Sequence, residues 1–380
     1  MKTAKRGGIP PFFAMEVLRE ANARAAAGGE VIHLEVGQPS SAAPRGVLAA
    51  AQAALSADPL GYTEALGIPQ LRGRIARHYR ETYGVEVSSD RIVVTTGSSG
   101  AFLLAFLAAF EAGDCVALAE PGYPAYRNIL QSLGNEAVGL PVGVGSRFQP
   151  KAEVLESLSR APAGLIVASP ANPTGTMLLG DELAELARYC DRHGIRLVSD
   201  EIYHGITYGE AAASVLSFSQ SAIVVNSFSK YYSMTGWRIG WMVVPPELQR
   251  SIECLAQNLF ISPPTLAQYA AVAAFDCRDE LDANVRRYRI NRDLLLAELP
   301  KAGFDRLAPS DGAFYIYADV AKLTNDSQDF CRRMLAETGV AATPGVDFDP
   351  SRGQAFVRFS FAGSTSDIEA AVRRLRVWRR

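Results

Sequence analysis

One lysine stands in a segment whose neighbours suit it for covalent chemistry. The segment Ser227-Phe-Ser-Lys-Tyr-Tyr-Ser-Met-Thr-Gly-Trp-Arg-Ile-Gly240 follows an apolar run at Ala222–Asn226 that is typical of a buried strand. Lys230 is therefore expected at the carboxyl end of a strand, where α/β sheets bind ligands. A lysine amine that loses its proton there can form a Schiff base with an aldehyde. The donors that a phosphate monoester requires are nearby: Ser227, Ser229 and Arg238.

Two other apolar runs end in polar turns. Ser199-Asp-Glu-Ile-Tyr203 closes the run Ile195–Asp200, and Ala168-Ser-Pro-Ala-Asn-Pro-Thr-Gly175 follows the run Leu165–Ser169. Standing alone, an aspartate after a strand is typical of a helix cap. Asn-Pro together with Thr-Gly is ordinary turn punctuation. On their own, these two motifs leave a structural and a functional interpretation open.

A glycine-rich turn before an apolar helix pattern could bind phosphate. Thr96-Gly-Ser-Ser-Gly100 lies between the run Arg91–Thr96 and the helix pattern Ser99–Glu111. Free backbone amides at a helix start bind anions, and the helix dipole adds to this attraction. A tight connection without a ligand is the alternative. A further motif, Glu120-Pro-Gly-Tyr-Pro-Ala-Tyr126, follows the run Cys115–Ala119 and holds two tyrosines.

In this order, the motifs resemble those of class I/II aminotransferases, the pyridoxal-phosphate (PLP) enzymes of fold type I that are related to aspartate aminotransferase. The similarity extends from Gly37 to Arg358, and several matches in order are far more specific than one pattern. The resemblance implies that PLP is the cofactor and that Lys230 carries it. It also implies that Ser227, Ser229 and Arg238 bind the cofactor phosphate.

The resemblance assigns roles at the cofactor ring. Asp200 matches the aspartate that faces the pyridine nitrogen and keeps it protonated, so that the ring can accept electrons. Tyr203 and Asn172 match the residues that contact the ring oxygen O3′, and the asparagine also contacts the substrate carboxylate. Tyr123 matches the aromatic residue that stacks on the ring. Tyr126 is expected to have only a packing role.

The family pattern also reaches the phosphate, the substrate and a partner subunit. Ser98 and Ser99 match the phosphate loop. Gly37 matches a glycine whose backbone lies over the substrate, and Arg358 matches the arginine that grips the α-carboxylate with its planar fork. Tyr62 resembles a tyrosine that reaches the PLP phosphate of a neighbouring subunit. This match implies a homodimer with shared active sites.

The elements that position these residues alternate between strand and helix patterns. Such alternation predicts an α/β fold with a mostly parallel, buried sheet flanked by helices. The sixth strand is expected at Ile239–Val244, and further helices are expected at Ile68–Tyr83 and Asp181–His193. Together with the resemblance, this pattern predicts a large PLP-binding domain over residues 45–275.

The pattern of predicted helices and strands changes after Pro263, where a smaller α+β unit is expected. A long helical pattern runs over Leu266–Leu299, with a possible break near Cys277–Asp279. Strands are then expected at Phe314–Ala318 and Ala355–Phe361, and helices at Ser327–Thr338 and Asp367–Trp378. We expect residues 276–380 and the N-terminal arm, residues 1–44, to form this second domain. In the strand around Arg358, the apolar neighbours should point to the opposite face.

Composition excludes several other classes of protein. Hydrophobic residues make up 48% and charged residues 21%, and the net charge is -2, so a basic nucleic-acid or membrane surface is not expected. The five cysteines and four histidines are dispersed, which predicts neither a disulfide framework nor a metal site. Unpaired cysteines favour the cytoplasm. No signal peptide and no membrane-spanning run are expected.

The interpretation that results is an aminotransferase that exchanges an amino group between an L-amino acid and a 2-oxo acid in a ping-pong scheme. A PLP-dependent C–S β-lyase on the same fold is the nearest alternative, because one fold hosts many chemistries. A non-catalytic amino-acid sensor is the alternative from another class. The complete set of site residues argues against it.

The sequence leaves the substrate open. Arg127 is a candidate for binding a distal carboxylate only because it neighbours Tyr126, and a surface role is equally compatible. Phe12, Phe13 and Tyr62 could line an apolar pocket or pack at a dimer contact. Asp349 replaces the family's glycine after the Pro-Gly-x-x-Phe turn, so the local geometry of that loop is not predictable.

Overall fold

A seven-stranded sheet forms the centre of the larger part of the computed structural model, which describes residues 2–378. In spatial order its strands are β2 (Ile92–Thr95), β8 (Gly240–Val243), β7 (Ile223–Ser227), β6 (Arg196–Asp200), β5 (Gly164–Ala168), β3 (Cys115–Glu120) and β4 (Glu136–Pro141). Strand β8 is antiparallel to both neighbours, and the other pairs are parallel. The predicted mostly parallel sheet is confirmed, with each predicted strand placed to within one residue.

Helices cover both faces of this sheet because successive strand side chains point to opposite sides. In β5, Leu165 and Val167 face one core, and Ile166 faces the other. The first core is covered by α2 (Arg45–Ala57), α3 (Pro69–Tyr83), α7 (Gly180–His193) and α9 (Thr265–Ala274). The second is covered by α4 (Gly97–Ala109), α5 (Pro124–Leu133) and α8 (Gln249–Leu259). A short helix, α6 (Ala152–Glu156), precedes β5.

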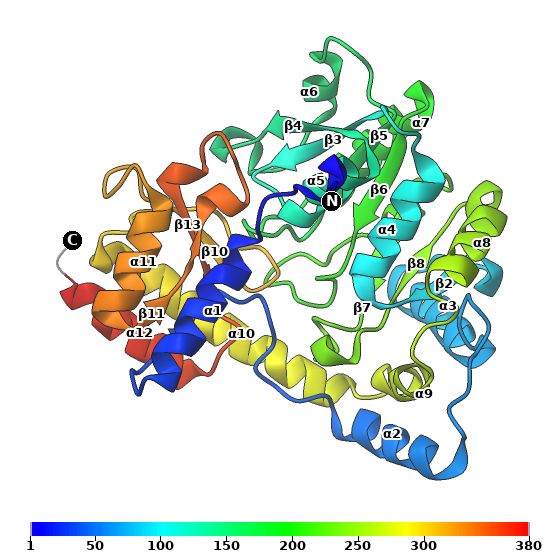
Figure 1. The fold of residues 1–380 in the computed structure, drawn as a ribbon, viewed down its shortest axis with the longest axis horizontal. Coiled ribbons are helices and arrows are strands. Elements are labelled where there is room, and N and C mark those ends of the chain that lie inside the picture. The colour runs from blue at the N-terminus through cyan, green and yellow to red at the C-terminus, as the bar shows by residue number, and fades with distance from the viewer. Residues whose placement is uncertain (1, 379–380) are drawn as a thin grey trace.

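A smaller unit is built on a four-stranded antiparallel sheet. Its strand order is β12 (Thr343–Pro344), β13 (Phe356–Ser360), β10 (Tyr315–Asp319) and β9 (Arg306–Leu307). Helices α10 (Arg278–Glu298), α11 (Ser327–Thr338) and α12 (Thr365–Val377) share its separate core. In Figure 1, α10 (yellow) extends from the larger unit to the smaller one. The predicted break falls between α9 and α10.

The N-terminal segment contacts the smaller unit. Helix α1 (Phe13–Ala26) contacts β12 and β11 (Val340–Ala341), and β1 (Ile32–His33) pairs in parallel with β11. Figure 1 shows α1 (blue) lying across the α11 and α12 side of the molecule. The predicted domain boundaries, 44/45 and 275/276, fall just before α2 and between α9 and α10. They stay predictions.

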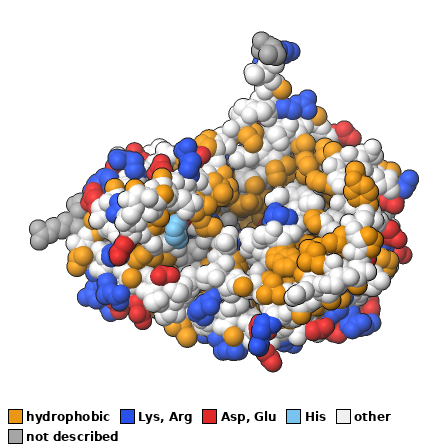
Figure 2. Space-filling view, turned by 60° about the horizontal axis from the view of Figure 1, so that its bottom comes forward, with side chains coloured by type: hydrophobic (Ala, Val, Ile, Leu, Met, Phe, Trp, Pro, Cys, Tyr) orange, Lys and Arg blue, Asp and Glu red, His pale blue; other side chains and the backbone are white. Residues whose placement is uncertain are grey.

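Short 3-10 helices complete the described chain. They are η1 (Lys5–Gly7), η2 (Ser89–Arg91), η3 (Val144–Ser146), η4 (Val215–Ser217), η5 (Thr235–Trp237), η6 (Pro246–Leu248), η7 (Pro300–Ala302), η8 (Gly345–Asp347) and η9 (Gly353–Ala355). Within residues 2–378, no helix combines the length and the hydropathy that crossing a membrane requires. One face of the molecule is recessed, and hydrophobic side chains gather around the recess (Figure 2).

Candidate active site

A cavity of about 500 Å³ lies beyond the carboxyl ends of β5, β6 and β7, where the smaller unit meets the larger one. Polar or ionisable side chains from both units line it. The predicted site residues among them are Gly37, Ser98, Ser99, Tyr123, Asn172, Asp200, Tyr203, Ser229, Lys230, Arg238 and Arg358. Residues far apart in the sequence therefore meet at the edge of the sheet where α/β folds bind ligands.

Lys230 projects into this cavity from the loop after β7. Its Nζ donates a hydrogen bond to the carbonyl oxygen of Gly37 over 2.6 Å. Burial and the nearby Arg358 guanidinium lower the pKa of the Lys230 amine from 10.5 to about 8. A lysine with this pKa has a substantial neutral fraction near neutral pH, as a nucleophile or general base requires. A Cβ at Gly37 would overlap the hydroxyl of Tyr315, so the absence of a side chain at Gly37 allows Tyr315 to lie this close to it.

Asp200 lies at the end of β6 with only 3% of its surface exposed. Burial raises the pKa of its carboxyl to about 6, although hydrogen bonds from the Tyr126 hydroxyl and the Ile202 amide counteract this rise. The prediction that Tyr126 only packs is therefore wrong: its hydroxyl donates to Oδ2 of Asp200. A contact across 74 residues leaves no local sequence signal.

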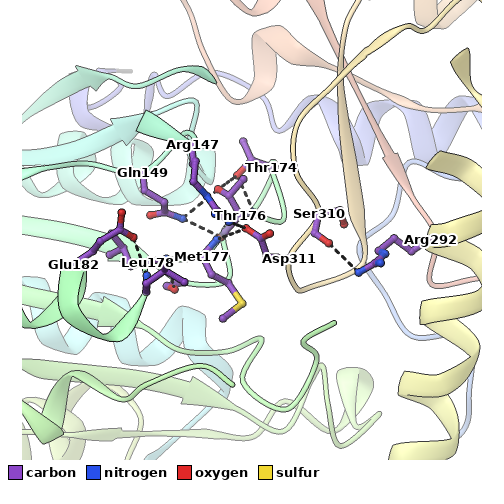
Figure 3. Close-up of polar contacts among 12 residues, drawn as sticks. Arg147, Gln149, Thr174, Thr176, Met177, Leu178, Glu182, Arg292, Ser310 and Asp311 are labelled. Atoms are coloured by element: carbon purple, nitrogen blue, oxygen red, sulfur yellow. Dashed lines mark hydrogen bonds and ion pairs between the residues drawn. The ribbon is translucent and has the colours of Figure 1, made fainter. Parts of the chain in front are cut away.

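The turn that carries Asn172 is held by both units. Gly312 donates its amide to the carbonyl of Gly175 over 2.8 Å, and Met177 donates its amide to Oδ2 of Asp311 over 3.2 Å. Figure 3 shows that Arg147 also reaches Asp311, and its Nη2 lies 2.6 Å from the same Oδ2 atom. In the same view, Gln149 donates to the Thr176 carbonyl over 2.9 Å. Hydrogen bonds from both units therefore hold this turn and fix the position of Asn172.

Arg358 is almost fully buried between two aromatic rings. Its guanidinium carbon lies 4.4 Å from the ring centroid of Tyr315 and 4.8 Å from that of Phe348. Nη1 donates to Oδ1 of Asn172 over 2.8 Å, whereas Nε has no hydrogen-bond partner among the described residues. Its neighbours Val357 and Phe359 pack into the core of the smaller unit, so the predicted alternation is confirmed. Nη2 donates to the Glu35 carbonyl and to the Thr343 hydroxyl, so these contacts hold the planar fork at the cavity wall.

A second group of residues in the cavity lining is suited to a phosphate. Helix α4 begins at Gly97, so the first amides of the helix, including those of Ser98 and Ser99, have no partner within it. A Cβ at Gly97 would lie 2.6 Å from Nη2 of Arg238, which places that guanidinium directly against the helix start. Ser229 lines the same region. Amides, hydroxyls and a guanidinium are the donors that bind phosphate oxygens.

Aromatic side chains form the walls. Tyr203 and Tyr315 share a hydrogen bond between their hydroxyls over 2.6 Å. The ring of Tyr123 stands nearly perpendicular to that of Phe12, with 5.8 Å between the centroids. Sequence reasoning missed Tyr315 as a site residue, because in a buried strand an alternating tyrosine gives the same pattern as a core residue.

Comparison with known proteins agrees with this geometry. The family model described as "Aminotransferase class I and II" matches residues 29–375. A relative from Mycobacterium tuberculosis, named valine–pyruvate aminotransferase, is 53% identical over 381 residues, covering 99% of this chain and 98% of its own length. The chain belongs to the class I and II aminotransferases. Enzymes of this family use PLP, so this aminotransferase is a PLP-dependent enzyme acting on amino and 2-oxo acids.

Solved structures place the aminotransferase in fold type I. A crystal structure of an aminotransferase from Mycobacterium tuberculosis, 53% identical, covers 100% of this chain and 99% of its own, with a TM-score of 0.98. Aspartate aminotransferase from Thermus thermophilus with maleate is 30% identical, covers 99% of both chains and has a TM-score of 0.93. The expected fold class is confirmed.

The residues present fit PLP. A buried carboxylate, Asp200, and a lysine of lowered pKa, Lys230, lie in one cavity with the phosphate donors around Gly97 and Arg238. Arg358 lines the same cavity and carries a guanidinium that suits a carboxylate. An aldehyde, a pyridine nitrogen and a phosphate each find a chemically matched group here.

Two predicted cofactor residues of the aminotransferase do not line the cavity. Ser227 is buried, and its hydroxyl lies 2.9 Å from that of Ser229 and 3.2 Å from the Ile239 carbonyl, so it supports Ser229 from behind. Tyr62 is 83% exposed on the surface of the single chain. Its predicted contact with a partner subunit stays a prediction.

The structure also places Arg127 and Asp349, whose roles the sequence left open. Arg127 lies 3.5 Å from Glu120 and does not line the cavity. Asp349 is buried and accepts the amides of Ser351 and Arg352, at 2.9 and 2.8 Å. Its other oxygen pairs with the Arg352 guanidinium at 2.8 Å. The aspartate thus shapes the turn with its side chain, where the family pattern has glycine.

Proposed function

We propose that this aminotransferase transfers the amino group of valine, or of a similarly branched apolar amino acid, to pyruvate. The printed name of the 53% identical Mycobacterium tuberculosis relative supports this pair of substrates. The observation that carries the proposal is the nature of the cavity wall. Phe12, Ala14 and Met15 line it, and the cationic lining residues are those already matched to cofactor or α-carboxylate: Lys230, Arg238 and Arg358.

The wall favours an apolar side chain for a simple reason. A distal carboxylate would be buried without a cation to pair with, which costs several kcal/mol. Arg127, the one other candidate raised by the sequence, is paired with Glu120 outside the cavity. Each methyl group of a branched side chain gains about 0.8 kcal/mol on burial against such a wall.

We assign the chemical roles by position. PLP, when bound, supplies an aldehyde carbon and a pyridine ring that accepts electrons. The neutral Nζ of Lys230 removes the proton from the amino-acid Cα and later returns a proton. The ionised carboxylate of Asp200 holds a proton on the pyridine nitrogen. Arg358 and Asn172 orient the α-carboxylate, so that the Cα–H bond faces Lys230.

The remaining contacts hold the cofactor in place. We assign the phosphate to Arg238, Ser229 and the start of α4 at Ser98 and Ser99. We assign the Tyr203 hydroxyl and Asn172 to the ring oxygen, and the Tyr123 ring to stacking on the pyridine. Ser227 acts through Ser229 in this assignment.

We further propose a homodimer in the cytoplasm. An exposed tyrosine, Tyr62, follows Gly61, whose carbonyl accepts a hydrogen bond from Thr265 over 2.6 Å, so the loop is anchored while the ring projects outward. A ring held in this way suits contact with the phosphate of a second subunit. The five unpaired cysteines support a reducing compartment. Light scattering after gel filtration tests the dimer, and a monomeric mass for the active enzyme would contradict it.

The substrates are tested with single amino acids and no acceptor. Release of a 2-oxo acid in an amount equal to the enzyme sites would measure the first half of the reaction for valine, isoleucine, alanine, phenylalanine and aspartate. We expect valine to exceed aspartate by at least about tenfold in kcat/KM, and pyruvate to complete turnover by forming alanine. Preference for aspartate would refute the proposed substrate, while pyruvate and ammonia from a cysteine conjugate would indicate lyase chemistry.

A further inference from the structure

The first turn of α1 lacks a cap from its own segment. Phe12 precedes the helix, and it offers no side-chain hydrogen bond to the free amides. Those amides find a partner far along the chain: the Phe13 amide donates to Oδ1 of Asp347 over 3.0 Å, and the Ala14 amide donates to Oδ2 over 3.1 Å. One carboxylate therefore uses both oxygens to hold the start of this helix.

Asp347 is itself firmly held in the smaller unit. It ends η8, is 2% exposed and follows β12, which contacts α1. The next residue, Phe348, accepts the Gly122 amide over 3.0 Å and packs its ring on Arg358. Burial raises the pKa of the Asp347 carboxyl to about 6, while the two amides, Arg358 and Arg127 favour the charged form. Asp347 thus connects α1 to the carboxylate-binding arginine through one neighbour.

The turn held by Asp347 is also the apolar wall of the cavity. Phe12, Ala14 and Met15 line the cavity, and the Phe12 ring meets the edge of Tyr123 from the larger unit. The two amides bonded to Asp347 lie within this stretch of residues. The hydrogen bonds to Asp347 therefore hold the backbone from which the side chains of this wall project.

We propose that Asp347 is a positioning residue for substrate specificity, which fixes Phe12, Ala14 and Met15 against the side chain of the bound amino acid. This inference rests on the proposed function, because it assigns the apolar wall to the side chain of the donor. Asp347 itself does not line the cavity. Its loss should therefore weaken the recognition of the side chain and leave the chemistry of the α-carbon in place.

The test compares two donors that differ only in the methyl groups facing the wall. Valine carries two methyl groups more than alanine, which corresponds to about a tenfold difference in recognition. In Asp347→Ala we expect kcat/KM to fall about tenfold for valine and no more than about twofold for alanine. The valine loss should be mainly in KM. Asp347→Asn keeps the size of the side chain and one acceptor oxygen. Its kcat/KM for valine should lie between those of Asp347→Ala and the wild type.

A matched control removes an equivalent cap elsewhere. Asp326 accepts the amides of Gln328 and Asp329 at the start of α11, over 3.1 and 3.0 Å, and its side chain does not line the cavity. Asp326→Ala should leave the valine-to-alanine ratio unchanged. A second variant, Phe12→Ala, removes part of the wall with the cap intact and should reproduce the selective loss for valine. If Asp347→Ala folds poorly, Asp347→Asn keeps the test of Asp347 decisive.

Amide hydrogen exchange gives a readout that does not depend on activity. The amides of Phe13 and Ala14 should exchange faster in Asp347→Ala, and those in α11 should not. Equal losses for valine and alanine would overturn the proposal and leave Asp347 as an ordinary structural cap, as would wild-type kcat/KM for valine. Failure of the substrate assignment is separately visible, because it would show as a preference for aspartate in the wild-type enzyme.

Discussion

Nη1 of Arg358 donates a hydrogen bond to Oδ1 of Asn172 over 2.8 Å, although the two residues come from different structural units. Arg358 lies in β13 of the smaller unit, and Asn172 lies in the turn after β5 of the larger one. This bond joins the units across the cavity. It also orients the fork, whose Nε has no partner among the described residues.

Replacing Arg358 by lysine should therefore weaken substrate binding selectively. A lysine keeps the charge and loses the planar bidentate geometry. We expect KM for the amino acid to rise about 100-fold, which corresponds to about 2.7 kcal/mol, with PLP still bound. Asn172→Ala should have a smaller effect, and the double variant should cost less than the sum because the two residues share one interaction. Additive losses would contradict this coupling.

Tyr126 should control the ionisation of Asp200. Its hydroxyl donates to the carboxylate, and that bond favours the charged form, so Tyr126→Phe should raise the pKa of Asp200 above its present value of about 6. Since the ionised form holds the proton on the pyridine nitrogen, the acidic limb of the kcat/KM profile should move to higher pH by about one unit. Tyr317→Phe removes another buried hydroxyl, one with no hydrogen-bond partner among the described residues, and should not move that limb. An unmoved limb in Tyr126→Phe would contradict the assignment.

The amine of Lys230 should set the pH dependence of cofactor attachment. The neutral amine reacts with an aldehyde, and its pKa is about 8. The rate at which apoenzyme takes up PLP should therefore rise about tenfold per pH unit below 8 and level off above it. Arg358→Leu removes a positive charge that lowers this pKa, so the midpoint should move to higher pH. Lys230→Ala should form no covalent bond with PLP at any pH, while its circular dichroism stays that of the wild type.

Much of the fold is predictable because its signals are local. Helix α11 has the predicted bounds, since Asp326 caps its start and Gly339 adopts a left-handed conformation, with φ of 72°, at its end. Buried strands of the large sheet read as apolar runs. Strand β4 was not predicted, because it is a half-exposed edge strand with glycine and proline in its sequence.

The site likewise contains residues that local motifs identify and contacts that they do not. Lys230, Asp200 and Asn172 stand at strand ends in recognisable motifs, so the sequence was sufficient to place them together. The contacts of Tyr126 with Asp200 and of Asp347 with α1 join residues 74 and more than 300 positions apart. Such partners depend on tertiary packing, which periodicity and spacing do not encode.

A buried carboxyl next to the site should make stability depend on pH. Glu201 is 1% exposed, and its Oε1 accepts the Val215 amide over 2.9 Å, whereas Oε2 has no hydrogen-bond partner among the described residues. Burial raises the pKa of Glu201 from 4.5 to about 8. The neighbouring His204, whose pKa is lowered to about 3 by burial, is neutral and supplies no compensating charge.

The folded protein therefore retains a proton on Glu201 that the unfolded chain has lost above pH 4.5. Its contribution to stability is fully present below pH 4.5 and is lost as pH rises through about 8, by roughly 2 to 3 kcal/mol between pH 6 and pH 9. Glu201→Gln has the same shape and does not titrate, so its melting temperature should fall less over that range. Thermal unfolding of both proteins at pH 6, 7.5 and 9 measures the difference. Parallel curves for the two proteins would show that Glu201 is ionised in the fold.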